Sequence, residues 1–186
     1  KYKYVDIDFI LQENKEQHIN VWTDASTSYG AGGYSSLGNL YHLPWNSLKL
    51  GNKNKFLHRY KYEIKDHIIY LELLAVINMT FLYAKNWKNK FIKFYCDNGT
   101  VVKALNSGTL KFNSKLYFPK ANLLKLFARL ALKHQFYLKA IHIEGQKNPI
   151  ADALSRENEF NRQLIYKKFN KSYCIPSKIV SNIVSA

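Results

Sequence analysis

The stretch INVWTDASTSYGAGGYSSLGNLYHLPW, residues 19–45, carries the signals that decide how the chain begins to fold. A short β-rich run, INVWT, ends at Asp24, and a second run begins at Gly30 after a turn rich in Ser and Thr. The sequence LGN at 37–39 marks another turn before the run LYHLPW. We therefore expect three strands that follow one another as an antiparallel meander.

Helices and strands are expected to alternate after the meander. Apolar residues recur at helical spacing over 67–85, where Asp66 is a candidate N-cap, and FIKFYC at 91–96 is typical of a buried strand. Together these segments predict an α/β fold in which helices pack on a mixed sheet. The remaining expected elements are a short helix at 98–106, a Leu-rich helix that starts at Pro119, a strand at 136–143, and a helix capped by Asn148 with Pro149 at its first position.

Lysine dominates the charge of the chain. The length of 186 residues fits one domain, and the 47% of hydrophobic residues can form a core without help from metals or disulfides. The 28 Lys and Arg against 13 Asp and Glu leave a net charge of +15, which attracts polyanions such as nucleic acid. A generally Lys-rich solvated surface would explain the same charge, so composition alone leaves both interpretations open.

The two cysteines, Cys96 and Cys174, have no metal-binding spacing. They predict neither a zinc site nor a disulfide framework, and they fit a reducing intracellular compartment, the cytoplasm or nucleus. The most apolar stretch, 68–84, contains Glu72 and Asn78, so we expect no membrane span. The sequence begins without a signal-peptide pattern and without an initiator Met, which favours a fragment excised from a longer protein.

Four carboxylates fall on the ends of elements, where α/β proteins gather ligands. Asp24 ends the first strand and Asp97 the fourth, while Glu72 lies near the start of the first long helix and Asp152 in the first turn of the last. If the two strands are neighbours, all four can converge at one edge of the sheet. Phosphodiester hydrolysis needs an activated water, charge neutralisation and a stabilised leaving oxygen. Two Mg²⁺ ions about 4 Å apart supply all three, and Mg²⁺ prefers carboxylate ligands.

Each carboxylate also has an ordinary structural explanation. Asp24 fits a turn, Glu72 a solvated helix position, and Asp97 the N-cap of the helix that follows it. Asp152 would complement a helix dipole. Their order along the chain, each on the expected type of element, favours a shared site over four separate explanations.

A series of short motifs extends this pattern over residues 19–156. The motifs are TDAS at 23–26, GAG at 30–32, LELLA at 71–75, CDN at 96–98, LNSGT at 105–109, HIEG at 142–145, Asn148, and ADALSR at 151–156. Together they resemble the ribonuclease H domain of retroelement reverse transcriptases, with gypsy-type and DIRS-type elements the most similar. The last motif is the most specific, whereas the first or third alone would be weak.

The resemblance implies a ribonuclease H-like fold, with a five-stranded mixed sheet in the order 3-2-1-4-5 and helices on both faces. It implies hydrolysis of the RNA strand of an RNA–DNA hybrid with two Mg²⁺ or Mn²⁺ ions. It also implies a reverse transcriptase polymerase domain in the same polyprotein as a partner. Asp24 would bridge both ions and Asp152 would help to hold the ion that activates water. Glu72 and Asp97 would hold the ion on the leaving-group side.

Substrate contacts are expected around these acids. Backbone groups near Ala25 and Ser26 would sense ribose 2′-hydroxyls, which separate RNA from DNA. Asn98 is a further candidate for substrate binding. His142 lies on the fifth expected strand, where a structural role is favoured and help in product release is the alternative.

Residues 46–66 form a basic loop or insertion in this interpretation. Aromatic residues interleaved with its bases would suit a phosphate track with stacking, and a merely solvated loop stays open as the alternative. The candidate substrate-binding bases are Lys49, Lys53, Lys55, Arg59 and Lys61.

We expect an N-terminal extension at 1–18, the catalytic domain at 19–156, and a C-terminal tail or the start of the next polyprotein segment at 157–186. Transposases and integrases of the same fold place their Glu last, whereas Glu72 is the second acid here. A proofreading exonuclease would carry an acid where this chain has Ser26. The alternative that stays open is a nuclease-inactive or domesticated ribonuclease H-like module that binds nucleic acid or acts as a scaffold.

Overall fold

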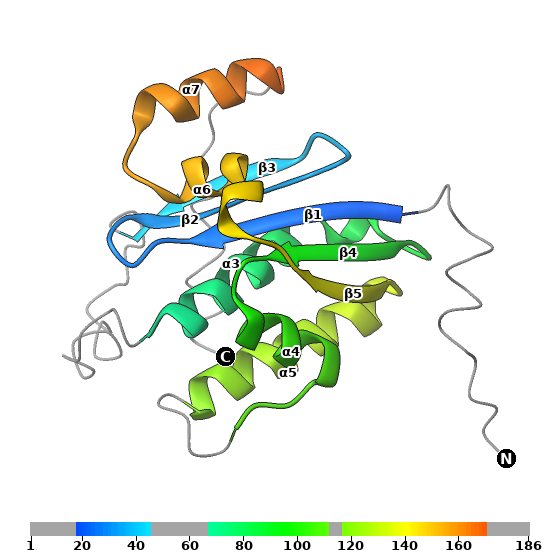
Figure 1. The fold of residues 1–186 in the computed structure, drawn as a ribbon. Coiled ribbons are helices and arrows are strands. Elements are labelled where there is room, and N and C mark those ends of the chain that lie inside the picture. The colour runs from blue at the N-terminus through cyan, green and yellow to red at the C-terminus, as the bar shows by residue number, and fades with distance from the viewer. Residues whose placement is uncertain (1–17, 46–66, 112–116, 171–186) are drawn as a thin grey trace, which may run out of the picture.

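Five strands form one mixed sheet in the order β3-β2-β1-β4-β5 (Figure 1). The computed structural model describes residues 18–45, 67–111 and 117–170. The expected fold class and strand order are confirmed, as is the expected order of helices and strands up to Ser155. In chain order the elements are β1 (His18–Ala25), β2 (Gly30–Ser35), β3 (Leu40–Pro44), α3 (Ile68–Tyr83), η4 (Ala84–Asn86), β4 (Phe91–Cys96), α4 (Gly99–Ser107), α5 (Tyr117–His134), β5 (Tyr137–His142), η5 (Gly145–Lys147), α6 (Pro149–Ser155) and α7 (Glu159–Lys168).

Strand β1 is the centre of the sheet. It pairs with β2 antiparallel, so that Asp24 lies opposite Gly32, and it pairs with β4 parallel, so that Trp22 lies opposite Tyr95. The ladder with β2 continues through Asp24 to Ala25, and β1 is therefore longer than the run that ends at Thr23 in the sequence. The parallel pairing brings the carboxyl ends of β1 and β4 to the same edge of the sheet.

Helices cover the two faces of the sheet unequally. Helices α3, α4 and α5 lie on one face, and α6 and α7 lie on the other, over the meander (Figure 1). Helix α3 is buried at every position from Leu71 to Thr80, because it packs against β1 and β2 on one side and α5 on the other. A helix that is apolar all round belongs in a core.

Within the part of the chain that the structure describes, the segment Ile68–Asn86 is long and apolar enough to cross a membrane. Its most apolar window is 61% buried inside the protein, and it holds the buried polar residues Glu72, Asn78 and Thr80. These features are those of a core helix.

Aromatic rings close the core beneath β4. Trp87, fully buried after η4, meets Phe94 and Phe136 edge to face at centroid distances of 5.8 and 5.3 Å. Phe127 of α5 contacts Phe94 in the same manner at 5.6 Å. Such pairs add to the free energy gained by burial, and they fix α5 and the start of β5 against the sheet.

Helix α7 differs from the sequence expectation, which assigned residues 157–186 to a tail or a following segment. Residues 159–168 are helical, and Tyr166 is buried in a cluster with Leu40 of β3 and Leu154 of α6. The Asn158 side chain caps the helix by accepting a hydrogen bond from the backbone N–H of Asn161. The buried or contacting residues recur at helical spacing, a signal that the mixed polar composition hid. They are Arg162, Ile165, Tyr166 and Phe169.

Two expected helix starts also differ in detail. Helix α5 begins at Tyr117, and Pro119 lies in its first turn, where a missing N–H costs no helical hydrogen bond. The N-cap of α3 is His67, without a side-chain hydrogen bond. The candidate cap Asp66, the loop 46–66 and residues 171–186 lie outside the described residues.

We predict that Tyr166→Ala lowers the free energy of unfolding by about 3 kcal/mol, because it removes a buried ring from between α6 and β3. Phe160→Ala on the same helix is the matched control, since Phe160 is 70% exposed and its loss should change the value by less than about 0.5 kcal/mol. Urea denaturation followed by circular dichroism measures both. Equal effects of the two variants would contradict the packing of α7 described above.

Candidate active site

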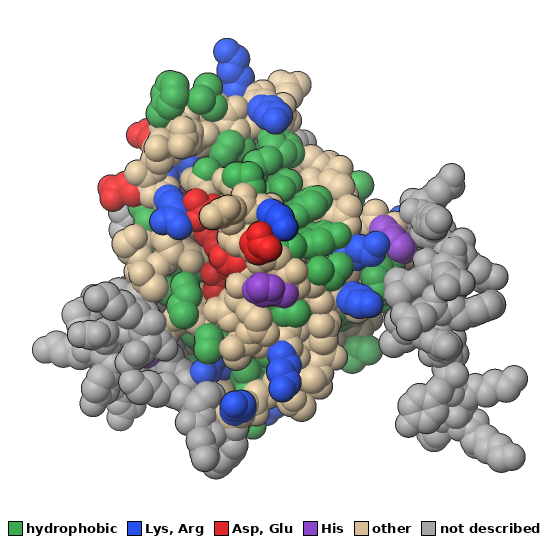
Figure 2. All heavy atoms as spheres, in the orientation of Figure 1, with side chains coloured by type: hydrophobic (Ala, Val, Ile, Leu, Met, Phe, Trp, Pro, Cys, Tyr) green, Lys and Arg blue, Asp and Glu red, His purple; other side chains and the backbone are tan. Residues whose placement is uncertain are grey.

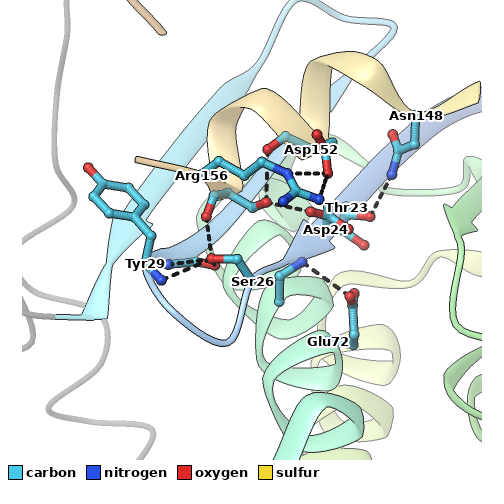
Figure 3. A network of polar contacts seen from close by, with 11 residues as sticks. Thr23, Asp24, Ser26, Tyr29, Glu72, Asn148, Asp152 and Arg156 are labelled. Carbon is cyan, nitrogen blue, oxygen red and sulfur yellow. Dashed lines mark hydrogen bonds and ion pairs between the residues drawn. The ribbon is translucent and has the colours of Figure 1, made fainter. Parts of the chain in front are cut away.

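Asp24 and Glu72 are buried carboxylates that meet beneath the end of β1. Asp24 is 6% exposed on the strand, and Glu72 is 2% exposed on α3. The Oε1 atom of Glu72 accepts a hydrogen bond of 3.2 Å from the backbone N–H of Ala25 (Figure 3). This bond crosses from helix to strand and fixes one carboxylate next to the other.

Asp97 completes a group of possible ligands with Glu72 and Cys96, whose donor atoms all lie within 4.8 Å of one another. Burial raises the pKa of the Cys96 thiol well above its usual range, and the charge of Glu72 raises it further. The thiol therefore keeps its proton and donates a hydrogen bond of 3.7 Å to Oε2 of Glu72. A protonated thiol is a poor metal ligand, so the two carboxylates are the donors that count in this group.

The N-cap of α4 is Asn98 and not Asp97. The Asn98 side chain accepts hydrogen bonds from the backbone N–H groups of Thr100 and Val101, at 3.1 and 3.3 Å. The carboxylate of Asp97 is thereby free of the capping role that the sequence offered as its ordinary explanation. Gly145 leaves room beside it, because a Cβ there would lie 3.1 Å from Oδ2 of Asp97.

Helix α6 brings Asp152 to the other three acids. It lies directly on β2, where a Cβ at Gly32 would fall 2.3 Å from the Cβ of Leu154 and 2.9 Å from the carbonyl oxygen of Ala151. Asn148 occupies the expected N-cap position, but its side chain makes no capping bond. Its amide instead donates to the carbonyl oxygen of Thr23 over 3.0 Å, which ties the start of α6 to β1.

The end of α6 contributes two more polar groups to the cluster. The Ser155 hydroxyl donates to Oδ2 of Asp24 and lies 2.9 Å from the carbonyl oxygen of Asp152 (Figure 3). The Arg156 guanidinium is paired with Oδ1 of Asp152, through Nε at 2.7 Å and Nη2 at 2.6 Å. The chain therefore places one cation of its own at the outer side of the carboxylates.

Asp24 is repelled by the charges of the other acids around it. Burial raises the pKa of Asp24 from 3.8 to about 6, and the charges of Asp97 and Asp152 raise it while the Ser155 hydrogen bond and Arg156 lower it. Burial also raises the pKa of Glu72 well above its usual range, with further contributions from Asp24 and Asp97. A site that holds buried acids at this cost fits hard divalent cations, which offset the charge and take oxygen ligands.

The expected substrate-contacting residues near the acids already bond within the protein. The Ser26 hydroxyl donates to the carbonyl oxygen of Ser155 over 2.7 Å and accepts from the backbone N–H of Tyr29 and Gly30. The Ala25 N–H is held by Glu72, and the Oδ1 of Asn98 by its capping bonds. Ser26, Ala25 and Asn98 thus position the site, and their contact with substrate stays a prediction.

His142 is exposed at the end of β5, and its Nε2 lies 3.0 Å from the carbonyl oxygen of Asp97. This contact links β5 to the strand end that carries Asp97, in line with the favoured structural role. A role in product release stays a prediction. The five basic candidates of the loop, Lys49, Lys53, Lys55, Arg59 and Lys61, lie outside the described residues.

Sequence reasoning missed the residues that assemble the acids. Ser155 and Arg156 were quoted only as parts of a motif, and Gly32 as part of a glycine-rich run. The spacing of Asp152, Ser155 and Arg156 over one helical turn was the available signal, because residues three and four apart share a helix face. The role of Arg162 was also missed. Its Nη1 donates to the carbonyl oxygen of Arg156, and its guanidinium lies 4.6 Å from the ring centre of Tyr29.

Solved structures share this arrangement of elements, whereas no family model and no curated protein matches the chain. A ribonuclease H1 isolated from compost is 16% identical, covering 74% of this chain and 92% of that one, with a TM-score of 0.47. Ribonuclease H1 from Halobacterium salinarum NRC-1 is 14% identical over 74% and 93%, with a TM-score of 0.49. A foamy viral protease-reverse transcriptase is 17% identical over 74% and 89%, with a TM-score of 0.42.

The fold is ribonuclease H-like. The strand order β3-β2-β1-β4-β5, with three helices on one face and α6 on the other, establishes it from this chain's own topology. The similarities to solved structures, at identities of 14–17% and TM-scores of 0.42–0.49, say nothing about activity. The function has to be argued from the carboxylates and their surroundings.

We predict that Gly32→Ala displaces α6 and weakens the binding of divalent metal, because the new methyl group would overlap backbone and Leu154 atoms. The free energy of unfolding should fall by about 2 kcal/mol or more. Gly99→Ala is the matched control, since its Cβ would meet only an atom of His142 at 3.8 Å. Isothermal titration with Mn²⁺ and urea denaturation measure both effects. Unchanged Mn²⁺ affinity in Gly32→Ala would contradict the dependence of Asp152 on this contact.

We predict that, without metal, the protein loses stability as the pH rises from about 4 through 6. The folded protein keeps the Asp24 proton up to about pH 6, whereas the unfolded chain loses it near 3.8. The raised folded pKa therefore stabilises the protein at low pH, and about 3 kcal/mol is lost above pH 6. Urea denaturation across this range should show the loss in the wild-type protein and a smaller loss in Asp24→Asn. Identical pH profiles for the two would contradict the assignment.

Proposed function

We propose that this chain is a metal-dependent ribonuclease H that hydrolyses the RNA strand of RNA–DNA hybrids. The observation that carries the proposal is the convergence of four carboxylates from separate elements at one end of the sheet. Asp24 interacts electrostatically with Glu72, Asp97 and Asp152, and Glu72 also with Asp97. Buried or half-buried acids gathered in this way are unfavourable unless they hold a cation, and perturbed pKa values of this kind are typical of functional sites.

Two Mg²⁺ or Mn²⁺ ions are the cofactors that we propose. Asp24, at the centre of the group, would contact both ions, with Glu72 and Asp97 on one side and Asp152 on the other. When bound, the ions would activate a water, neutralise the scissile phosphate and stabilise the leaving oxygen.

The chain's own residues hold the carboxylates in place for this chemistry. The Ser155 hydroxyl orients Asp24 through Oδ2, and the Ala25 N–H orients Glu72 through Oε1. Hydrogen bonds to ligating carboxylates commonly set both their orientation and the affinity for metal. Arg156 stays exposed at its outer side, with 64% of its side chain accessible, and presents a cation next to the position proposed for the phosphate.

An RNA–DNA hybrid is the substrate class that we propose, in the setting of a retroelement polyprotein with a polymerase domain. The net charge of +15 supports a polyanionic substrate. The motif ADALSR supports the retroelement setting, and in the structure three of its residues, Asp152, Ser155 and Arg156, all belong to the carboxylate cluster. An intracellular location is proposed with this setting.

One observation favours a second candidate, a nuclease-inactive module that binds nucleic acid. The ion pair between Arg156 and Asp152 neutralises one of the four acids without any metal. If this pair persists in the presence of divalent cations, the site would lack one ligand and would bind substrate without cutting it.

Hydrolysis of a labelled RNA–DNA hybrid tests the proposal. We predict cleavage of the RNA strand that requires Mg²⁺ or Mn²⁺ and falls at least about 100-fold in Asp24→Asn. Losing only a hydrogen bond to a metal ligand can lower activity by up to about 100-fold, and this variant changes the ligand itself. Glu72→Gln should be similarly inactive. Glu159→Gln, the same change at an exposed helix position, should keep full activity.

Single-stranded RNA and duplex DNA serve as substrate controls and should not be cut. Tight binding of the hybrid by wild-type protein, with no cleavage in either metal, would favour the nuclease-inactive module. Cleavage that survives Asp24→Asn would show that the carboxylate cluster is not the catalytic site.

A further inference from the structure

A second surface lies on the same side of the sheet as α6, over β4 and β5. Side chains alternate along strands, so every second residue of β1, β4 and β5 faces this side. Among the described residues, α6 and α7 pack on β1, β2 and β3 and leave this part uncovered. We define the open face by six of the residues that the strand register places on this side, which are Trp22, Lys93, Tyr95, Tyr137, Lys139 and Ile141.

Stacked aromatic rings form part of the open face and its border with β2. Trp22 lies between Tyr34 and Tyr95, with centroid distances of 4.7 and 5.1 Å and interplanar angles of 7° and 14°. Ile141 is paired with Tyr95 in the strand register and extends the row to β5. Figure 2 shows a band of hydrophobic side chains between the acidic cluster and a group of Lys or Arg side chains on this side of the molecule.

Two lysines lie side by side on the open face, and neither has an anionic partner among the described residues. Lys93 and Lys139 are directly paired in the β4–β5 register, an arrangement of like charges that destabilises a sheet. Neither makes an ion pair within the described residues. Burial lowers the pKa of the neighbouring His18, and Lys93 lowers it further, so positive charge is already in excess here. An anion bound between the lysines would relieve this repulsion.

Tyr137 adds an accessible ring to the same face. It is 60% exposed at the start of β5, two residues from Lys139. An exposed aromatic ring beside paired lysines offers a stacking surface and a phosphate contact at once. Proteins bind single-stranded nucleic acid through this combination, since unpaired bases can stack on aromatic side chains.

The open face is continuous with the carboxylate cluster. Trp22 precedes Asp24 by two residues on β1, and Lys93 precedes Asp97 by four on β4. At about 3.3 Å per residue, the paired lysines lie roughly 13 Å from the strand end that carries Asp97. A strand that leaves the cluster can therefore reach the lysines within a few nucleotides.

We propose that the open face binds single-stranded nucleic acid that extends from a hybrid held at the carboxylates. The phosphates contact Lys93 and Lys139, and bases lie against Tyr137, Tyr95 and Ile141. A duplex fits this face less well, because its bases are paired and stacked inside. The inference rests on the proposed function for the position of the hybrid, whereas binding of a free single strand tests the face independently.

Fluorescence anisotropy without divalent metal provides the test. The probes are a single-stranded DNA of about 16 nucleotides, a blunt RNA–DNA hybrid, and the same hybrid with a single-stranded extension. We expect the extension to tighten binding by wild-type protein. Lys93→Gln combined with Lys139→Gln should abolish that gain. It should also reduce the slope of log Kd against log salt for the single strand by about 1.4, the value for two phosphate contacts.

The matched control is Arg129→Gln combined with Lys133→Gln, two exposed bases of α5 on the opposite side of the sheet. This control removes the same charge and should keep the gain from the extension. Tyr137→Ala should weaken single-strand binding about tenfold and leave the salt slope unchanged. Thermal unfolding by circular dichroism confirms that each variant is folded.

Two outcomes would overturn the proposal. The first is an extension that adds no affinity to the wild-type protein, which would make the open face a candidate contact for another protein. The second is an equal loss in both double variants, which would indicate only a general attraction to basic surface. Hydrolysis of the blunt hybrid, measured in parallel, should be the same in all variants. If the wild-type protein does not hydrolyse the blunt hybrid, this result would contradict the proposed ribonuclease activity and not the binding of single strands to the open face.

Discussion

The contact between α6 and β2 at Gly32 is the constraint on which the site depends. Three of the acids belong to β1, α3 and the end of β4, which the core already holds together, but Asp152 belongs to a helix of seven residues on the other face. A short helix cannot fix itself, and its position follows from what it packs against. The absent side chain at Gly32 lets the backbone of α6 approach the sheet closely enough for Ser155 to reach Asp24. One missing methyl group thus determines whether the acids form a cluster.

The cluster is electrostatically unfavourable, and the surrounding protein offsets only part of the cost. Asp24 receives a hydrogen bond from Ser155, Glu72 receives one from Ala25 and one from the Cys96 thiol, and Asp152 is paired with Arg156. The pKa values of Asp24 and Glu72 remain raised despite these partners. The cluster therefore lowers the stability of the folded protein, and the large apolar core around α3 supplies the free energy that offsets this loss.

Most of the fold could be predicted from the sequence, because the patterns that determine it involve residues close together in the chain. The turn at Gly38 and the helical spacing of apolar residues up to Met79 each arise from residues close together in the sequence. The same holds for the alternation of strands and helices after Met79. Together these patterns predict the sheet and its helices. The four acids were found from their places at element ends. Their supporting contacts were not, since Ser26 with Ser155 and Asn148 with Thr23 join residues more than a hundred positions apart. Helix α7 was not predicted because its buried side is narrow, and only Arg162 and Tyr166 on it are buried.

Because α7 holds the end of α6, the site is completed late in the synthesis of the chain. Asp24, Glu72 and Asp97 leave the ribosome early, whereas the cluster needs Asp152, and the end of α6 is held in turn by Arg162 of α7. Domains fold progressively from the N-terminus as the chain emerges. A nascent chain that has exposed only the first three acids lacks the Ser155 hydroxyl that orients Asp24. The site is completed only once residues up to about 170 have emerged, so an incomplete chain carries the fold's core without its fourth carboxylate.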